Sequence, residues 1–128
     1  MNTDTKKEVI VIVTPIYEDK KAATLLFKDI KKIINRELYI IAVDDGSLLN
    51  PMEIGILKNI GLQGVVIKLK RNVGHQRAIA IGLNYAAEEL SEAAKVVVMD
   101  SDGEDLPENI NNLLLTLEDT TSDLSLIH

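Results

Sequence analysis

The sequence contains no cysteine, only 3% aromatic residues and no long apolar run. Without cysteine the chain can form neither a disulfide framework nor a thiolate zinc site, and it has no cysteine nucleophile. No apolar stretch approaches the roughly 18 residues of a transmembrane helix. The polar start, Met1–Lys7, also lacks the apolar core of a signal peptide. These absences predict a cytoplasmic segment without a membrane span of its own.

The chain also lacks the basic excess that nucleic-acid binding requires. Its formal net charge is −6, whereas a protein that binds a phosphate backbone presents a clustered basic surface. We therefore expect no nucleic-acid partner. With 128 residues and 46% hydrophobic content, the chain is long enough for one compact domain over residues 1–128. Because aromatics are scarce, its core must be built from aliphatic side chains.

Short apolar runs alternate with stretches of helical periodicity. Four runs are rich in β-branched residues, as in strands covered on both faces: Val9–Val13, Tyr39–Val43, Val65–Leu69 and Val96–Met99. A helix of about 16 residues is expected around Ala22–Ile33, and others over Pro51–Ile60, Gly74–Leu90 and Pro107–Leu117. The last residues, Asp123–His128, look like the start of a fifth strand. This order predicts an α/β fold with a mostly parallel sheet flanked by helices.

Polar residues follow each predicted strand. In an open parallel sheet, ligands bind outside the carboxyl ends of the strands. The segments at these ends are therefore where a site is expected: Thr14–Asp19, Asp44–Ser47, Lys70–His75 and Asp100–Gly103.

Asp100 and Asp102 form the first candidate pair. Two carboxylates close together repel each other, so a cation is expected between them, and their hard oxygen ligands suit Mg²⁺ or Mn²⁺. Such an ion could bridge to the diphosphate of a nucleotide. The alternative is that acidic residues here only populate turns and helix caps. An EF-hand is excluded for two reasons. Counted from Asp100, Gly103 falls at position four of the loop instead of position six, and position twelve is Asn111 instead of glutamate.

Asp44 and Asp45 end the second predicted strand. One of them could accept a hydrogen bond from a nucleobase N–H or a ribose hydroxyl, while the other shapes the turn. The alternative is an Asx-type turn with Gly46 supplying a permissive backbone.

Arg71, His75 and Arg77 cluster at the start of the third helix, where free backbone N–H groups favour an anion. They are candidate phosphate contacts. His75 could equally be a structural imidazole, and Arg77 a surface residue.

Three related protein classes fit less well. A nucleotidyltransferase should have a glycine-rich loop after its first strand, where this chain has Thr14–Tyr17. A receiver domain places its acidic pair after the first strand rather than the second. A Rossmann dehydrogenase requires G-x-G-x-x-G, which is absent.

The four strand ends together resemble those of the family 2 glycosyltransferases. Val9–Tyr17 is similar to the family's opening strand with its P-x-Y-N-E motif, and Ile41–Ser47 matches V-D-D-G-S. Arg71–Gly74 matches the N-x-G helix entry, and Val97–Asp102 matches the DxD strand. Within the family, residues 71–80 and 99–108 look most like polyprenyl-phosphate sugar transferases of the dolichol-phosphate mannose synthase type.

The resemblance implies a GT-A fold that binds a UDP- or GDP-sugar. By motif position, Pro15 and Tyr17 would lie beside the base, Asp45 would bond to it and Asp44 would support that loop. Asp100 with Asp102 would hold the metal and the sugar diphosphate. One departure concerns Glu18 and Asp19, which stand where the family has Asn-Glu.

The resemblance further implies sugar transfer to an acceptor, a polyprenyl phosphate, in cell envelope polysaccharide biosynthesis. The chain would be the N-terminal donor-binding half, truncated after the DxD region, with the catalytic base beyond His128 and this segment alone inactive. Membrane contact would come only through the missing C-terminal region, at the membrane surface. A homo-oligomer is left open. The alternative is a non-catalytic nucleotide-sugar-binding module.

Overall fold

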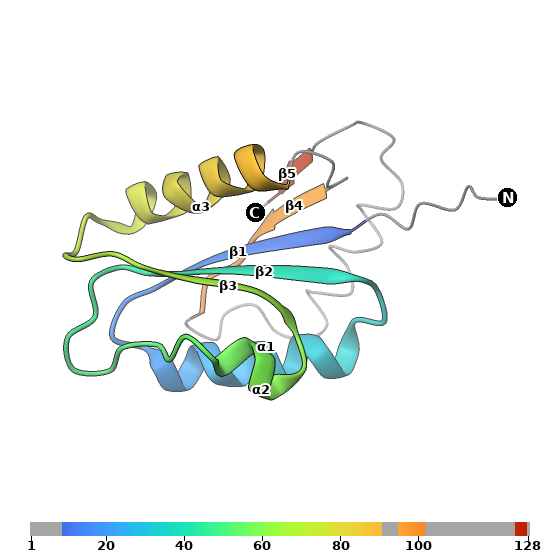
Figure 1. The fold of residues 1–128 in the computed structure, drawn as a ribbon, viewed down its shortest axis with the longest axis horizontal. Coiled ribbons are helices and arrows are strands. Elements are labelled where there is room, and N and C mark those ends of the chain that lie inside the picture. The colour runs from blue at the N-terminus through green and yellow to red at the C-terminus, as the bar shows by residue number, and fades with distance from the viewer. Residues whose placement is uncertain (1–8, 91–94, 102–124, 128) are drawn as a thin grey trace, which may run out of the picture.

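Strands and helices alternate along the chain in the computed structural model, which describes residues 9–90, 95–101 and 125–127. Figure 1 shows their arrangement. In chain order the elements are β1 (Ile10–Ile16), α1 (Lys20–Ile33), β2 (Leu38–Asp44), α2 (Ile56–Ile60), β3 (Gln63–Lys68), α3 (His75–Glu89), β4 (Lys95–Val98) and β5 (Ser125–Ile127). The helix predicted over residues 107–117 lies outside the described residues.

The strands form one parallel sheet in the order β3-β2-β1-β4-β5. The predicted α/β fold, Rossmann-like and consistent with GT-A, is thereby confirmed. So is the fifth strand, because Ser125–Ile127 pairs with Lys95–Val97 of β4. Since β1 leads to β2 and β3 on one side and the chain then crosses to β4 and β5 on the other, the order of strands reverses beside β1. The carboxyl ends of β1 and β4 therefore border the crevice where such folds bind ligands.

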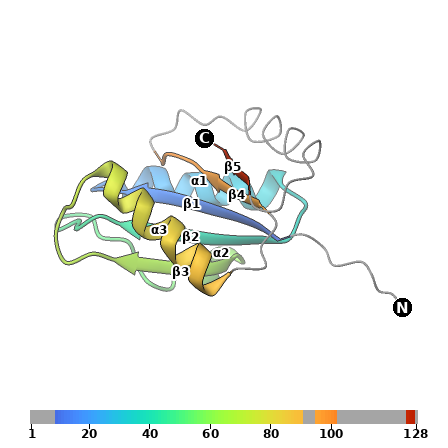
Figure 2. The same ribbon diagram turned by 90° about the horizontal axis from the view of Figure 1, so that it is seen from above.

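Each face of the sheet is covered by different helices. In Figure 1 and in the turned view of Figure 2, α1 and α2 lie on one face and α3 on the other. Alternate residues of β1 serve the two faces: Ile12 joins the cluster that contains Phe27 of α1, whereas Val13 joins the cluster with Ala78 of α3. No helix among the described residues is both long and apolar enough to cross a bilayer.

The first strand runs three residues beyond the predicted Val9–Val13, through Pro15 to Ile16. A proline is unusual in a central strand because it lacks the N–H that a neighbour would need. Pairing with β4 ends at Val13, however, and only β2 continues alongside, with Pro15 opposite Val43. The strand is thus locally an edge where the proline stands, and this edge borders the crevice.

The second predicted helix, Pro51–Ile60, is wrong in its first half, because α2 covers only Ile56–Ile60. The preceding backbone has other partners: the amide of Met52 donates to Asp44 Oδ2 at 2.9 Å. This bond holds the chain in a loop against the end of β2. The predicted end of this helix at Ile60 is confirmed, since Gly61 ends α2 in the left-handed conformation with φ of 97°.

Candidate functional site

A hollow of about 430 Å³ opens at the rim of the sheet where β1 and β2 end. Three of its walls come from the carboxyl end of β1, the end of β2 and the entry to α3. The hollow brings together four residues that the sequence analysis singles out: Pro15, Tyr17, Asp45 and His75. The rest of its lining is Ile16, Asn72 and Gly74. The structure thus gathers segments far apart in the chain at the predicted edge of the sheet.

Asp45 joins two of these walls. Its Oδ1 accepts the amide of Val73 at 2.7 Å, and its Oδ2 accepts the amide of Gly74 and the Nδ2 of Asn72, both at 3.1 Å. Its own amide donates to the carbonyl of Ile16 at 2.7 Å. The residue is buried. Asp45 therefore fastens the entry of α3 to the end of β2 while lining the hollow.

Asp44 is turned into the loop that follows β2. Its Oδ1 accepts the amide of Ser47 at 3.2 Å and its Oδ2 that of Met52 at 2.9 Å. Asp44 is only 1% exposed, and the hydrogen bonds from these two amides offset the cost of burying its carboxylate. This arrangement is of the Asx-turn kind that the sequence left open, and it leaves Asp44 as a support for the loop.

Gly46 brings the β2 loop against the β3–α3 loop. Its φ is +78°, in the left-handed region that glycine adopts without cost. A Cβ at this position would overlap the backbone of Arg71 and Asn72. The glycine is therefore required both by the turn and by the close approach of the two loops.

Tyr17 and Pro15 form the β1 side of the hollow. Tyr17 is 54% exposed, so a large part of its ring is open to a ligand. Pro15 is buried, and its carbonyl lies 3.4 Å from the hydroxyl of Ser101, just beyond β4. That contact ties the exits of β1 and β4 together across the switch in strand order.

His75 and Asp100 meet on the other side. His75 Nε2 lies 3.3 Å from Asp100 Oδ1, and both side chains are about half exposed, at 54% and 45%. The histidine opens α3 directly after Gly74 and lines the hollow, so the carboxylate of Asp100 lies beside the start of the helix. A carboxylate this accessible fits the oxygen-ligand chemistry of Mg²⁺ or Mn²⁺.

The remaining predicted residues are not gathered in the hollow. Arg71 and Arg77 are exposed and do not line it, so their phosphate contacts stay predictions. Asp102 lies outside the described residues. Within residues 9–90, 95–101 and 125–127 no three His, Asp or Glu side chains converge on a metal position, and the metal pair also stays a prediction.

Glu18 is a residue that sequence reasoning missed. Its carboxylate accepts the amides of three successive residues, Leu48, Leu49 and Asn50. The hydrogen bond from Leu48, followed by that from Asn50, holds the pKa of this carboxyl below its usual range. The one sequence signal was its departure from the family motif, where asparagine stands.

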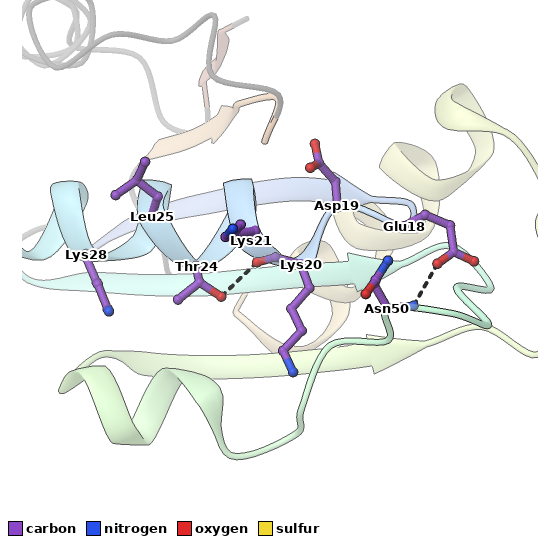
Figure 3. A pocket seen from close by; sticks show the side chains of 8 residues that line it. All are labelled: Glu18, Asp19, Lys20, Lys21, Thr24, Leu25, Lys28 and Asn50. Atoms are coloured by element: carbon purple, nitrogen blue, oxygen red, sulfur yellow. Dashed lines mark hydrogen bonds between the residues drawn. The ribbon is translucent and has the colours of Figure 1, made fainter.

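A larger hollow of about 680 Å³ lies beside α1, and Figure 3 shows its lining. Lys20, Lys21 and Lys28 border it, with Glu18 and Asn50 facing each other at one end. Of the residues in its lining, none was predicted to bind a ligand. The smaller hollow is the better candidate, because charged and polar groups from three strand ends converge there. Glu18 stands between the two.

Comparison with known proteins agrees with this geometry. Residues 11–127 match the family described as Glycosyl transferase family 2. The chain is also 31% identical over 109 residues to the uncharacterized glycosyltransferase YkcC of Bacillus subtilis (strain 168). That alignment covers 80% of this chain but 32% of YkcC, so the chain spans only a minor part of the relative's length. Since the family match extends over nearly all described strands and helices, the chain belongs to glycosyl transferase family 2.

Proposed function

We propose that this chain is the donor-binding part of a glycosyltransferase that uses a UDP- or GDP-sugar, with a polyprenyl phosphate as the acceptor. The observation that carries the proposal is the convergence of Tyr17, Asp45 and His75 on one hollow, with Asp100 beside it. The hollow lies at the carboxyl ends of parallel strands next to the switch in strand order, where α/β folds bind nucleotides.

The nucleobase end would lie against Tyr17 and Asp45. A carboxylate offers about four lone-pair positions, and Asp45 uses one on Oδ1 and two on Oδ2. The position left on Oδ1 can accept an N–H of a base. Asp44, whose two oxygens are taken up inside the loop, would act only as the support of that contact.

The diphosphate end would lie at the start of α3. Free backbone N–H groups there favour an anion, and His75 can add a hydrogen bond to a phosphate oxygen. Arg71 and Arg77 could contribute charge from the surface. Asp100 with Asp102 would hold Mg²⁺ or Mn²⁺, which when bound supplies positive charge opposite the diphosphate.

In the proposed reaction, the bond between the anomeric carbon and the diphosphate oxygen breaks, and a bond from that carbon to an acceptor oxygen forms. The nucleoside diphosphate leaves with the electron pair. A phosphate acceptor is already anionic and needs little help from a base. The choice of a polyprenyl phosphate rests on residues 71–80 and 99–108, which resemble transferases of that type. The longer protein would then act at the cytoplasmic membrane surface in cell envelope polysaccharide biosynthesis.

Isothermal titration of the chain with UDP, GDP and their sugars, with and without MnCl₂, tests donor binding. We expect binding of one nucleotide class, strengthened by Mn²⁺. D45A should abolish it, and the matched variant D29N, in the middle of α1 and away from the rim, should bind as wild type. Equal heats for D45A and wild type, or no binding under any condition, would reject the assignment. Binding without sugar transfer by the longer protein would favour a non-catalytic module.

A further inference from the structure

The carboxylate of Glu18 accepts hydrogen bonds from the backbone amides of three successive residues in a neighbouring loop. Oε2 accepts the amide of Leu48 at 2.6 Å and that of Leu49 at 3.2 Å, while Oε1 accepts Leu49 at 3.1 Å and Asn50 at 2.8 Å. Hydrogen bonds from neutral donors to an ionised acceptor are stronger than those between neutral groups. A single side chain thus holds three consecutive residues about 30 positions further along the chain.

The backbone of Glu18 is shaped for this contact. Its φ is +54°, and it has the one positive φ among the described residues other than glycine. A left-handed conformation is disfavoured for a side chain of this kind and persists only where the surroundings impose it. Its amide donates to Ser47 Oγ at 2.7 Å, so both the main chain and the side chain of Glu18 bind the same loop.

The loop has little else to hold it on its outer side. Leu48 and Leu49 are 84% and 85% exposed, so their side chains contribute little packing. On the inner side, Asp44 binds the amides of Ser47 and Met52. The segment between these two amides is anchored by Glu18.

This loop is continuous with the wall of the proposed donor site. Asp45 lies three residues before Leu48, and Tyr17 directly precedes Glu18. The contact of Glu18 with residues 48–50 therefore joins the two chain segments that follow the groups assigned to the base. Figure 3 shows Glu18 reaching from the exit of β1 to the loop at Asn50. This bridge joins the exit of β1 to the loop that follows β2.

We propose that Glu18 is a positioning residue for the donor: it clamps the loop 48–50 and thereby holds Tyr17 and Asp45 at the spacing that a nucleobase requires. The inference rests on the proposed function. It predicts that loss of the carboxylate weakens nucleotide binding although Glu18 contributes no wall to the hollow that would hold the base. The loss follows because only the fraction of molecules with the loop in place can bind.

The test compares wild type with E18Q and E18N in the full chain. E18Q keeps the length of the side chain but leaves one accepting oxygen, and its NH₂ group opposes an amide donor. E18N is one methylene shorter, and asparagine tolerates the left-handed backbone better than glutamate does, so this variant guards against simple misfolding. E53Q is the matched control, because Glu53 forms an ion pair with Lys20 at the nearby surface and no other side-chain contact of Glu53 is seen within the described part of the chain.

Two readouts separate the clamp from the proposed function. Amide hydrogen exchange of residues 48–50 without ligand reports the clamp, and calorimetric Kd values for UDP and GDP with MnCl₂ report its effect on the donor. We expect faster exchange and a Kd higher by roughly tenfold in E18N, with a smaller rise in E18Q, for a loop in place in about one molecule in ten. E53Q should match wild type in both.

Wild-type exchange rates at residues 48–50 in both Glu18 variants would overturn the clamp. Faster exchange with an unchanged Kd would overturn its role in positioning the donor and leave the proposed function standing. If wild type itself bound neither nucleotide, the proposed function would fail, and the inference with it.

Discussion

Carboxylates at the rim of this sheet bind backbone amides. Asp44 and Glu18 hold the inner and outer sides of the loop after β2, and Asp45 holds the entry to α3. Each replaces the partners that these amides lack outside regular structure. Asp45, which is assigned to the base, therefore also helps to build the loops around the hollow, and a substitution there acts on both.

Glu18 should titrate below the ordinary glutamate pKa, because loop amides stabilise its ionised form. A folded-state pKa below the unfolded value gives stability that is present above the unfolded pKa and is lost as the pH falls through the folded pKa. We expect the difference in unfolding free energy between wild type and E18Q to shrink across that acidic window. Carbon-detected NMR of the Glu18 carboxyl gives the midpoint directly, and a midpoint at or above the ordinary value would contradict the clamp.

Replacing Gly46 should be costly for two reasons. G46A places a Cβ into the backbone of Arg71 and Asn72 and forces alanine into a φ of +78°. Left-handed strain and overpacking together predict a loss of about 2–4 kcal/mol. Urea unfolding measures it. G55A is the control, since a Cβ there meets no atom within 4 Å, and a G46A protein as stable as G55A would show that the two loops do not meet as described.

At the scale of the elements, the apolar runs were enough to predict the strands, but their ends were not. The exit of β1 was predicted too short, because the apolar run ends at Val13 whereas pairing with β2 continues as far as Ile16 opposite Asp44. Pro51–Ile60 was predicted as a helix from its periodicity. That pattern could not show that the amide of Met52 donates to Asp44, which keeps the first half of the segment in a loop. Both errors come from partners distant in the sequence.

The packing of α3 on the sheet depends on Gly82. A Cβ there would lie 2.5 Å from Val13 Cγ1 and 3.1 Å from Val43 Cγ2, and valine side chains in a buried strand have little freedom to move. G82A should therefore destabilise the protein by about 1–2 kcal/mol, although alanine favours an isolated helix by about 1 kcal/mol. Thermal unfolding of G82A checks this, with N84A, on the exposed side of α3, as the control variant. A G82A protein more stable than wild type would mean that α3 stands further from the sheet.

At the scale of the whole molecule, the order of strands places the site. The sequence predicted that Tyr17, Asp45 and His75 lie at one edge, since parallel strands present their carboxyl ends together. It could not predict the contact between Glu18 and residues 48–50, which depends on one left-handed residue. The residue types alone left open which of Asp44 and Asp45 supports the loop, because neighbouring residues of identical type differ only in where the fold turns them. The family motif was needed to assign that support to Asp44.

Under the proposed function, the carboxyl rim of the sheet binds a nucleoside diphosphate and the opposite end of the sheet does not. An amide NMR titration of the chain with UDP and GDP in the presence of Mg²⁺ distinguishes the two ends. We predict shifts centred on Tyr17, Asp45 and residues 73–75, and none at the hollow of about 260 Å³ at the opposite end, around Asn35, Glu37 and Gln63. Shifts at that opposite end, with unchanged resonances for Tyr17, Asp45 and residues 73–75, would rule out donor binding at the rim.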